Sequence, residues 1–320
     1  MWTTRTMVVV VTSLLATACS DADGGDGSPT TTSSSTGVGG AGGSPTGTAG
    51  SGGTAGSGGT GGSSAGGSNG CNPAGSFTPA FHDDFESYSD GESLSGYNPF
   101  DAAGRTVATT AQAYGGSVSA RMEIQPADNG GFGQWGGILP LDPVLPKGSE
   151  IWVRLRVYWP VSFQFTASPF MKFLRLHNRT GAGDNGGYND LYVNNADGTT
   201  QVLGFIKEVH DVWEWYDGDP LLRDTWETYE MYLFVDDVPV DSGGEGRARV
   251  WRERELIIDR TDVPTITEAQ GVINSWYIFT YWNNETPPNN HCFVDDVTIA
   301  TSASTPPEAD AAGNCFIGDW

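Results

Sequence analysis

The chain has 320 residues, and its 39 acidic side chains outnumber its 16 Lys and Arg side chains, giving a formal net charge of −23. This charge argues against nucleic-acid binding, because a phosphate backbone is bound through a dense set of basic side chains. No apolar run is long enough to span a membrane. Twenty of the 45 glycines fall between residues 21 and 70, so a compositionally biased segment precedes a globular region that suits one large all-β domain.

The first 19 residues have the layout of an export signal. Arg5 precedes an apolar stretch, Met7–Leu15, and small residues follow up to Ala18, which is the order of regions in secretory signals. Small residues ending in Cys19 resemble a bacterial lipobox. The resemblance implies a lipidated Cys19 and an outer-membrane lipoprotein that contacts the membrane only through its lipid anchor, since the residue after the Cys is not acidic. The alternative is an ordinary signal that is cleaved after Ala18.

Residues 20–70 consist mainly of Gly, Ser, Thr and Ala and show no apolar periodicity. They cannot bury a core, so we expect a disordered linker with an end-to-end distance of about 40 Å. The predicted organisation is a signal at 1–19, a linker at 20–70 and a β-domain at 71–320. A tether of this kind suits capture of a large molecule outside the cell.

Export permits a disulfide among Cys71, Cys292 and Cys315. Cys71 opens the globular region, and the other two lie near its end, so we expect a bridge that joins the two ends of the domain. The pair Cys71–Cys315 is favoured over Cys71–Cys292. The sequence has no Cys-x-x-Cys motif and no His/Cys cluster, which argues against structural zinc.

The globular region shows the period-two alternation of half-buried strands. The predicted strands lie at 151–159, 170–179, 228–235, 249–258 (as a hairpin), 273–282 and 293–300. Loops rich in Gly, Asn, Asp and Pro separate them, notably at 181–190 and 283–290. Because no long helical pattern is present to cover a sheet, the region predicts an antiparallel two-sheet β-sandwich.

The order of these segments resembles the concanavalin A-like jelly roll over about residues 77–301. Phe81–Glu86 resembles the first strand of such domains, and Val294–Ile299 resembles the last, which pairs with the first. Three segments are more narrowly similar to alginate and glucuronan lyases of this fold: Arg156–Phe163, Lys172–Leu176 and Tyr277–Trp282. The resemblance implies that Lys172 and Tyr281 are candidate catalytic residues.

β-Elimination from a uronate requires a group that neutralises the carboxylate, a base for the C5 proton and an acid for the leaving oxygen. Arg175, His177 and Arg179 share one face of their predicted strand, with His177 as the candidate base. Period two places Lys172 on the opposite face, with Leu174 and Leu176, unless a bulge intervenes.

A second polar strand face carries Arg154, Arg156 and Tyr158. If both polar faces line one sheet, they form a cationic groove for an anionic sugar chain. The alternative is a pair of solvated faces whose Arg side chains pair with some of the many carboxylates.

Aromatic residues near loops are candidates for stacking on sugar rings. Trp215 and Trp282 are candidates for this role, and Asn283, directly after the late strand, is a further candidate for substrate binding. The alternative is that these rings fill the core of the sandwich.

Four carboxylates, Asp83, Asp84, Asp295 and Asp296, fall on the first and last strands. Oxygen ligands of this kind suit structural calcium, and strand-end hydrogen bonding with turn capping is the alternative. We expect no cofactor to be required.

The sequence thus favours an extracellular polysaccharide, anionic in the leading hypothesis, as the partner, and lyase chemistry on a uronate polymer as the activity. A lectin-like module without catalysis and an adhesion or scaffold domain without a sugar site are the alternatives.

Overall fold

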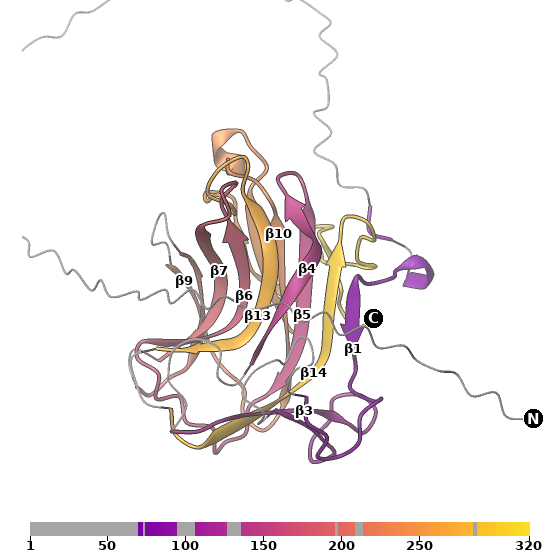
Figure 1. Cartoon of the computed structure of the whole chain (residues 1–320), viewed down its shortest axis with the longest axis vertical. Helices are drawn as coiled ribbons and strands as arrows, with labels where there is room; N and C mark the ends of the chain where they lie inside the picture. Colours follow the sequence, from indigo (N-terminus) through magenta and orange to yellow (C-terminus); the bar gives the residue numbers. More distant parts are fainter. Residues whose placement is uncertain are drawn as a thin grey trace, which may run out of the picture. The chain divides into compact units, whose positions relative to one another are not determined.

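The computed structural model describes residues 70–72, 74–94, 106–126, 136–195, 198–208, 214–283 and 287–320 (Figure 1). The predicted export signal, Cys19 and all but the last residue of the predicted linker lie outside these described residues. The chain divides into two units, Met1–Gly61 and Gly62–Trp320, and every described residue belongs to the second. No helix among the described residues is both long and apolar enough to cross a membrane.

The described residues form strands and two short 3-10 helices, with no α-helix among them. The strands are β1 (Phe81–Asp83), β2 (Val107–Thr109), β3 (Ser119–Ile124), β4 (Gly137–Pro146), β5 (Glu150–Tyr158), β6 (Phe170–Arg179), β7 (Asn185–Asn194), β8 (Val202–Lys207), β9 (Glu214–Pro220), β10 (Trp226–Phe234), β11 (Arg247–Arg252), β12 (Glu255–Arg260), β13 (Val272–Trp282), β14 (Asn290–Thr301), β15 (Glu308–Ala309) and β16 (Cys315–Phe316). The 3-10 helices are η1 (Ala74–Ser76) and η2 (Val240–Ser242).

Two large antiparallel sheets carry the fold, which confirms the predicted sandwich (Figure 1). The first sheet has the order β12-β11-β10-β5-β14-β3-β2, with β1 also paired to β14, and the second has the order β4-β13-β6-β7-β8-β9. The predicted pairing of the first and last strands is present, because Phe81 lies opposite Ile299. The hairpin predicted at 249–258 is the β11–β12 pair.

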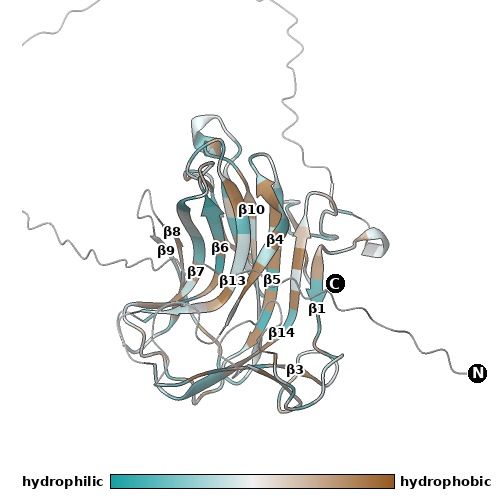
Figure 2. Cartoon of the chain, viewed as in Figure 1, coloured by the Kyte–Doolittle hydropathy of each residue, from teal (hydrophilic) through white to brown (hydrophobic). Residues whose placement is uncertain are grey.

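The core lies between the two sheets. Phe173 on β6 of the second sheet contacts Tyr229 on β10 of the first, with ring centroids 5.2 Å apart. Trp159, which follows β5, contacts Phe173 and Phe279 at 5.9 and 5.6 Å. Along β5, Val153 and its alternate neighbours are fully buried in this core. Figure 2 shows hydrophobic and hydrophilic residues alternating along β5, as a sheet with one core face requires.

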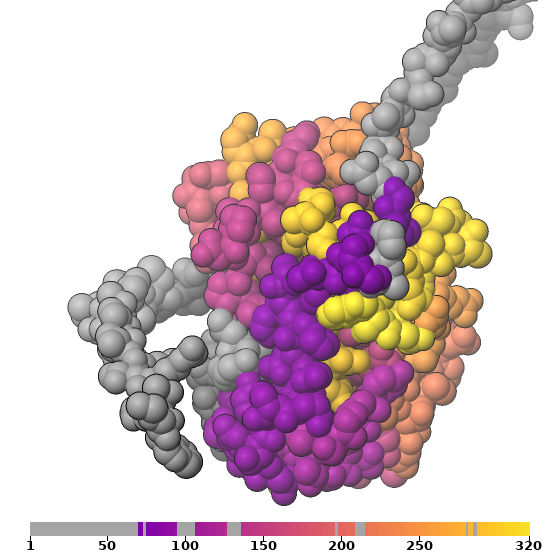
Figure 3. Space-filling model, turned by 90° about the vertical axis from the view of Figure 1, so that its right-hand side faces the viewer, coloured from indigo at the N-terminus to yellow at the C-terminus, as the bar shows by residue number. Residues whose placement is uncertain are grey.

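The other face of β5 is covered by the C-terminal segment, residues 315–320. Trp152 donates from Nε1 to the Cys315 carbonyl at 2.8 Å, and Arg154 donates to the carbonyls of Gly318 and Trp320 at 2.6 and 3.0 Å. Figure 3 shows this segment, in yellow, packed against the indigo start of the domain. Both ends of the domain therefore meet on the outer face of the first sheet.

A disulfide joins Cys71 to Cys315, with the two Cα atoms 5.4 Å apart. The predicted pairing is confirmed. Cys292 is a buried free thiol, and burial raises its pKa. Because the bridge ties residue 71 to the C-terminal segment, it holds that segment over the first sheet.

Glu230 on β10 anchors the C-terminal segment from below. Its carboxylate accepts the backbone N–H groups of Ile317 and Gly318 at 2.5 and 3.2 Å. Desolvation by burial is the main cause that raises the pKa of Glu230, to about 7, and these hydrogen bonds only partly oppose it. An unfolded Glu titrates near 4.3, so between that pH and 7 the folded state binds more protons than the unfolded state, and stability falls as pH rises through this window.

We predict that Glu230→Gln removes a pH dependence on the order of 2 kcal/mol in the free energy of unfolding between pH 5 and 7.5. Urea titrations at several pH values would measure the difference between the wild type and the variant. Glu255→Gln, an exposed change on β12, is the matched control. Parallel pH profiles for Glu230→Gln and the wild type would contradict the prediction.

Candidate functional site

An irregularity in β6 brings Lys172 to the same face as Arg175. Lys172 lies opposite Tyr192 on β7, whereas Leu174 lies opposite Leu191, so β6 carries one extra residue at this point. Phe173 and Leu174 are both fully buried in the core. The prediction from strict period two, that Lys172 lies on the face of Leu174, is therefore wrong. A bulge, which the sequence analysis allowed as an exception, is present between the two residues.

The neighbouring strand β13 is irregular at the same level. Ile278 lies opposite Leu174 and Tyr281 lies opposite Lys172, so β13 also has an extra residue between the two pairs. Phe279 adopts φ +52° and points into the core. The two irregularities together place Tyr281 beside Lys172 on the outer face of the second sheet.

The outer face of β6, β7 and β13 is a grid of polar and aromatic side chains. Cross-strand register gives three rows: Tyr281, Lys172 and Tyr192; Tyr277, Arg175 and Asp190; Ser275, His177 and Tyr188. We call this set, together with Glu208 at the end of β8, the polar face. Figure 2 shows hydrophilic residues on both β6 and β7, which carry the Lys, Arg, His, Asn and Asp residues of these strands.

Two cations and two carboxylates form an ion network at the centre of the polar face. Asp190 accepts from Arg175 Nε at 2.9 Å through one oxygen and lies 3.1 Å from Lys172 Nζ through the other. Glu208 also contacts both cations, with one oxygen on Lys172 and the other 3.3 Å from Arg175 Nη2. Each buried cation therefore has two anionic partners, and the two positive and two negative charges balance.

Aromatic rings extend this network along the face. The Arg175 guanidinium lies 3.8 Å from the ring centre of Tyr188 and 5.4 Å from that of Tyr281. Lys172 Nζ lies 4.9 Å from the Tyr281 ring centre. The His177 ring stacks on Tyr188 at 4.5 Å. Arg175 is thus the central group, with Lys172 and Tyr281 toward one end and Tyr188 and His177 toward the other.

Burial decides the protonation states in this cluster. Desolvation lowers the pKa of Lys172, although Asp190 opposes the shift. Desolvation also lowers the pKa of His177, helped by the charges of Arg179 and Arg175. His177 is therefore a neutral imidazole at pH 7, and such a ring can accept a proton. Burial raises the pKa of Tyr188 far above its ordinary value, so this phenol keeps its proton.

The sequence analysis did not single out several members of the polar face, among them Tyr188, Asp190, Tyr192 and Glu208. Residues 181–190 were expected to form a loop, but β7 begins at Asn185. The alternation of Tyr188, Asp190 and Tyr192 with Leu191 and Val193 was the available signal. The glycines at 186 and 187 masked it, because Gly is depleted in strands.

The predicted groove that combines both polar strand faces is not formed. Arg154 and Arg156 lie on β5 of the first sheet, on its outer face, whereas Arg175 lies on the second sheet. Arg156 pairs with Asp296 at 2.9 Å and lies 3.7 Å above the Tyr114 ring. The aromatic residue Tyr158 contacts Trp226 and Phe293 of the same sheet. These predicted substrate-binding residues face away from the polar face because the core separates the two sheets.

The remaining predicted contacts divide between surface and core. Arg179 is exposed at the end of β6 and donates to the Gly183 carbonyl at 2.7 Å. Trp282 has an exposed fraction of 1% and lies in the core, so its predicted role in stacking on sugar is wrong. Trp215 is partly buried and packs against the core. Asn283 pairs through its backbone with Phe170 and Ser168.

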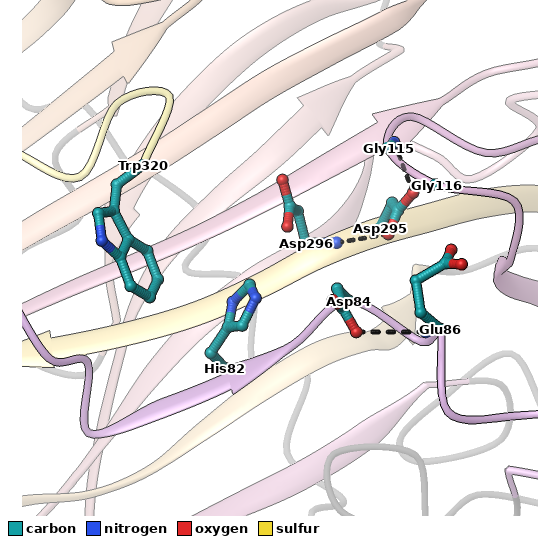
Figure 4. A pocket seen from close by; sticks show the side chains of 8 residues that line it. All are labelled: His82, Asp84, Glu86, Gly115, Gly116, Asp295, Asp296 and Trp320. Atoms are coloured by element: carbon teal, nitrogen blue, oxygen red, sulfur yellow. Dashed lines mark hydrogen bonds between the residues drawn. The ribbon is translucent and has the colours of Figure 1, made fainter.

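The predicted calcium ligands lie near a cavity of about 340 Å³ on the first sheet, which Asp84, Asp295 and Asp296 help to line (Figure 4). In Figure 4, His82 lies between Trp320 and Asp84. Asp84 and Asp295 accept backbone N–H groups, and Asp296 pairs with an arginine. Asp83 accepts the Phe85 N–H at 2.8 Å. Within the described ranges, no group of three or more His, Cys, Asp or Glu side chains is placed to hold a metal ion.

The fold has counterparts among solved structures. A double mutant of the alginate lyase Aly36B in complex with alginate trisaccharide is 14% identical, with a TM-score of 0.52 over 70% of this chain and 98% of that chain. A second Aly36B double mutant, in complex with alginate tetrasaccharide, is 16% identical, with a TM-score of 0.50 over 69% and 96%. An endo-β-1,4-glucuronan lyase from the fungus Trichoderma reesei is 12% identical, with a TM-score of 0.49 over 70% and 95%.

The predicted resemblance in fold to these lyases is confirmed. Identities of this size identify the fold alone. No protein-family model and no curated protein matches the sequence. The chemistry must therefore be argued from the polar face itself.

We predict that the His177 imidazole titrates below pH 6.5, the ordinary value for His. Its C–H resonances, followed by NMR between pH 4 and 8, would give the midpoint. Because the positive charge of Arg179 opposes protonation, Arg179→Gln should raise that midpoint slightly, with solvent screening limiting the change. A midpoint at or above 6.5 in the wild type would contradict the lowered pKa of His177.

Proposed function

We propose that this protein is a polysaccharide lyase that cleaves a uronate-containing glycan by β-elimination. The observation that carries the proposal is the bulge in β6, which places Lys172, Arg175 and His177 on one sheet face beside Tyr281. These side chains supply the three functions that the reaction requires, namely a carboxylate partner, a base and an acid. The Aly36B structures with bound alginate oligosaccharides share the fold and support a polysaccharide as the substrate.

Arg175 is the proposed partner of the uronate carboxylate, because it is central to the cluster and presents a planar fork of donors. Neutralising that carboxylate makes the adjacent C5 proton more acidic. Lys172, near the same position, adds positive charge where the enolate-like intermediate accumulates negative charge. Both cations are held in place by Asp190.

His177 is the proposed base. Its lowered pKa leaves a neutral imidazole to take the C5 proton. The electron pair of the C5–H bond forms the C4–C5 double bond, and the bond from C4 to the glycosidic oxygen breaks. Tyr281, on the other side of Arg175, is the proposed acid that gives its proton to that oxygen.

We predict that the purified wild type raises the ultraviolet absorbance of at least one polyuronate, as the C4–C5 double bond forms. His177→Ala and Tyr281→Phe should each lower kcat by about 10²–10⁴-fold, the range for loss of a general acid or base. Because the base acts in its neutral form, the acidic limb of the kcat/KM profile should lie below pH 6.5. Arg249→Gln changes a residue on the first sheet, away from the polar face, and serves as a control that should keep the wild-type rate.

The outcome of this assay separates the three functional hypotheses. Binding of a polyuronate without any unsaturated product would favour the lectin-like module. A folded protein that neither binds nor cleaves any polymer of the panel would leave the adhesion or scaffold domain. A wild-type rate retained in both His177→Ala and Tyr281→Phe would refute the assigned roles while leaving the activity in place.

The proposal includes surface display through Cys19, since an enzyme for a large polymer must reach it outside the cell. We predict that Cys19→Ser abolishes fatty-acid labelling of the full chain in a diderm bacterium and releases the protein from the membrane fraction. Ser20→Ala, which keeps the thiol, is the control. Unchanged labelling of Cys19→Ser would exclude this anchor.

A further inference from the structure

We propose that Glu208 occupies the position of the substrate carboxylate on Lys172 and Arg175, and that an anionic glycan binds by displacing it. This inference rests on the proposed function, since it concerns the same polar face. Glu208 is then a specificity-determining residue, because its carboxylate and the carboxylate of a uronate compete for the same two cations.

The contacts of Glu208 have the pattern expected for a bound uronate. One carboxylate oxygen meets Lys172 Nζ, and the other lies 3.3 Å from Arg175 Nη2. A uronate carboxylate has the same planar pair of oxygens, so it can bridge the same two donors. Glu208 and an anionic substrate therefore cannot hold this pair of donors at the same time.

The two carboxylates of the network differ in how firmly they are held. The side chain of Asp190 is 0% exposed and lies beneath the two cations, which are 4% and 2% exposed. The Glu208 side chain is 24% exposed, and its residue directly follows the end of β8. Asp190 is thus the permanent partner, and Glu208 is the outermost of the four groups and the one that an incoming ligand meets first.

The charges of Lys172 and Arg175 explain why the place of the Glu208 carboxylate beside them must be filled by an anion. Lys172 and Arg175 are nearly fully buried, and buried charges are costly unless they are paired. Without Glu208, Asp190 alone would face two positive charges. A uronate restores the balance that Glu208 provides, whereas a neutral sugar does not. The cluster therefore selects an anionic glycan, at the cost of an exchange step that weakens its binding.

The test is to titrate wild type, Glu208→Gln and Glu255→Gln with tetramers of mannuronate, guluronate and glucuronate, using calorimetry. Glu208→Gln keeps the side-chain shape and removes the charge, so at least one tetramer should bind about tenfold more tightly. This change in Kd corresponds to the lower end of the free-energy range for a hydrogen bond to a charged group. Glu255→Gln, exposed on the first sheet, changes the net charge equally and should bind like the wild type. The methyl-esterified tetramer, which lacks the charge, should not distinguish Glu208→Gln from the wild type.

Asp190→Asn should have the opposite effect and weaken tetramer binding. Asp190 holds Lys172 and Arg175 in place, so its loss disturbs the two cations that the ligand contacts. Thermal unfolding of each variant shows that the fold is retained. Equal or weaker binding of every tetramer by folded Glu208→Gln, including no binding at all, would overturn the inference. So would an equal gain for the methyl ester, because the effect would then not depend on the ligand's charge.

Cleavage assays with the same tetramers and with their parent polymers separate this inference from the proposed function. Cleavage with unimproved binding in Glu208→Gln would overturn only the role of Glu208. Tighter binding by that variant, with no unsaturated product from any protein, would overturn only the lyase.

Discussion

The shared carboxylate of Asp190 is the interaction on which the polar face depends. It accepts from Arg175 and pairs with Lys172, one oxygen for each, and it is itself fully buried. Two cations of one strand can lie against a sheet with almost no exposure only if an anion stands between them. This requirement fixes the register of β6 against β7 at Arg175 and Asp190, and through it the positions of the flanking aromatic rings.

The bulge in β6 and the matching irregularity in β13 connect the core to this cluster. Phe173 enters the aromatic core with Trp159 and Tyr229, which shifts Lys172 to the outer face. Phe279 enters the same core from β13 and brings Tyr281 out beside Lys172. Packing of large rings between the sheets therefore decides which polar side chains meet on the outside.

The two sheets use their outer faces differently. On the first sheet, Arg154 and Arg156 are covered by the C-terminal segment, which the Cys71–Cys315 bridge and Glu230 hold in place. The second sheet carries the cluster that we propose as the active site, and its outermost charge is the Glu208 carboxylate, which we propose a ligand displaces. The whole chain carries a strong negative charge, so the anionic glycan that we propose as ligand would be attracted only by cations that it contacts directly. Salt screens the long-range repulsion from the rest of the surface more strongly than it screens such contacts.

Period-two alternation in the sequence by itself predicted the all-β sandwich, and the positions of Cys71 and Cys315 near the two ends of the globular region favoured the bridge between them. The pairing of the first and last strands was implied by the resemblance to the concanavalin A-like jelly roll. Period two also placed Arg175 and His177 on one strand face, whereas Lys172 and Tyr281 became candidates through the resemblance to alginate and glucuronan lyases. Only the tertiary structure decided that Lys172 joins Arg175, that Arg154 does not, and that Trp282 is core. A bulge depends on what packs across the strands, and a partner such as Glu208 comes from a distant strand end, so neither can be seen along one strand.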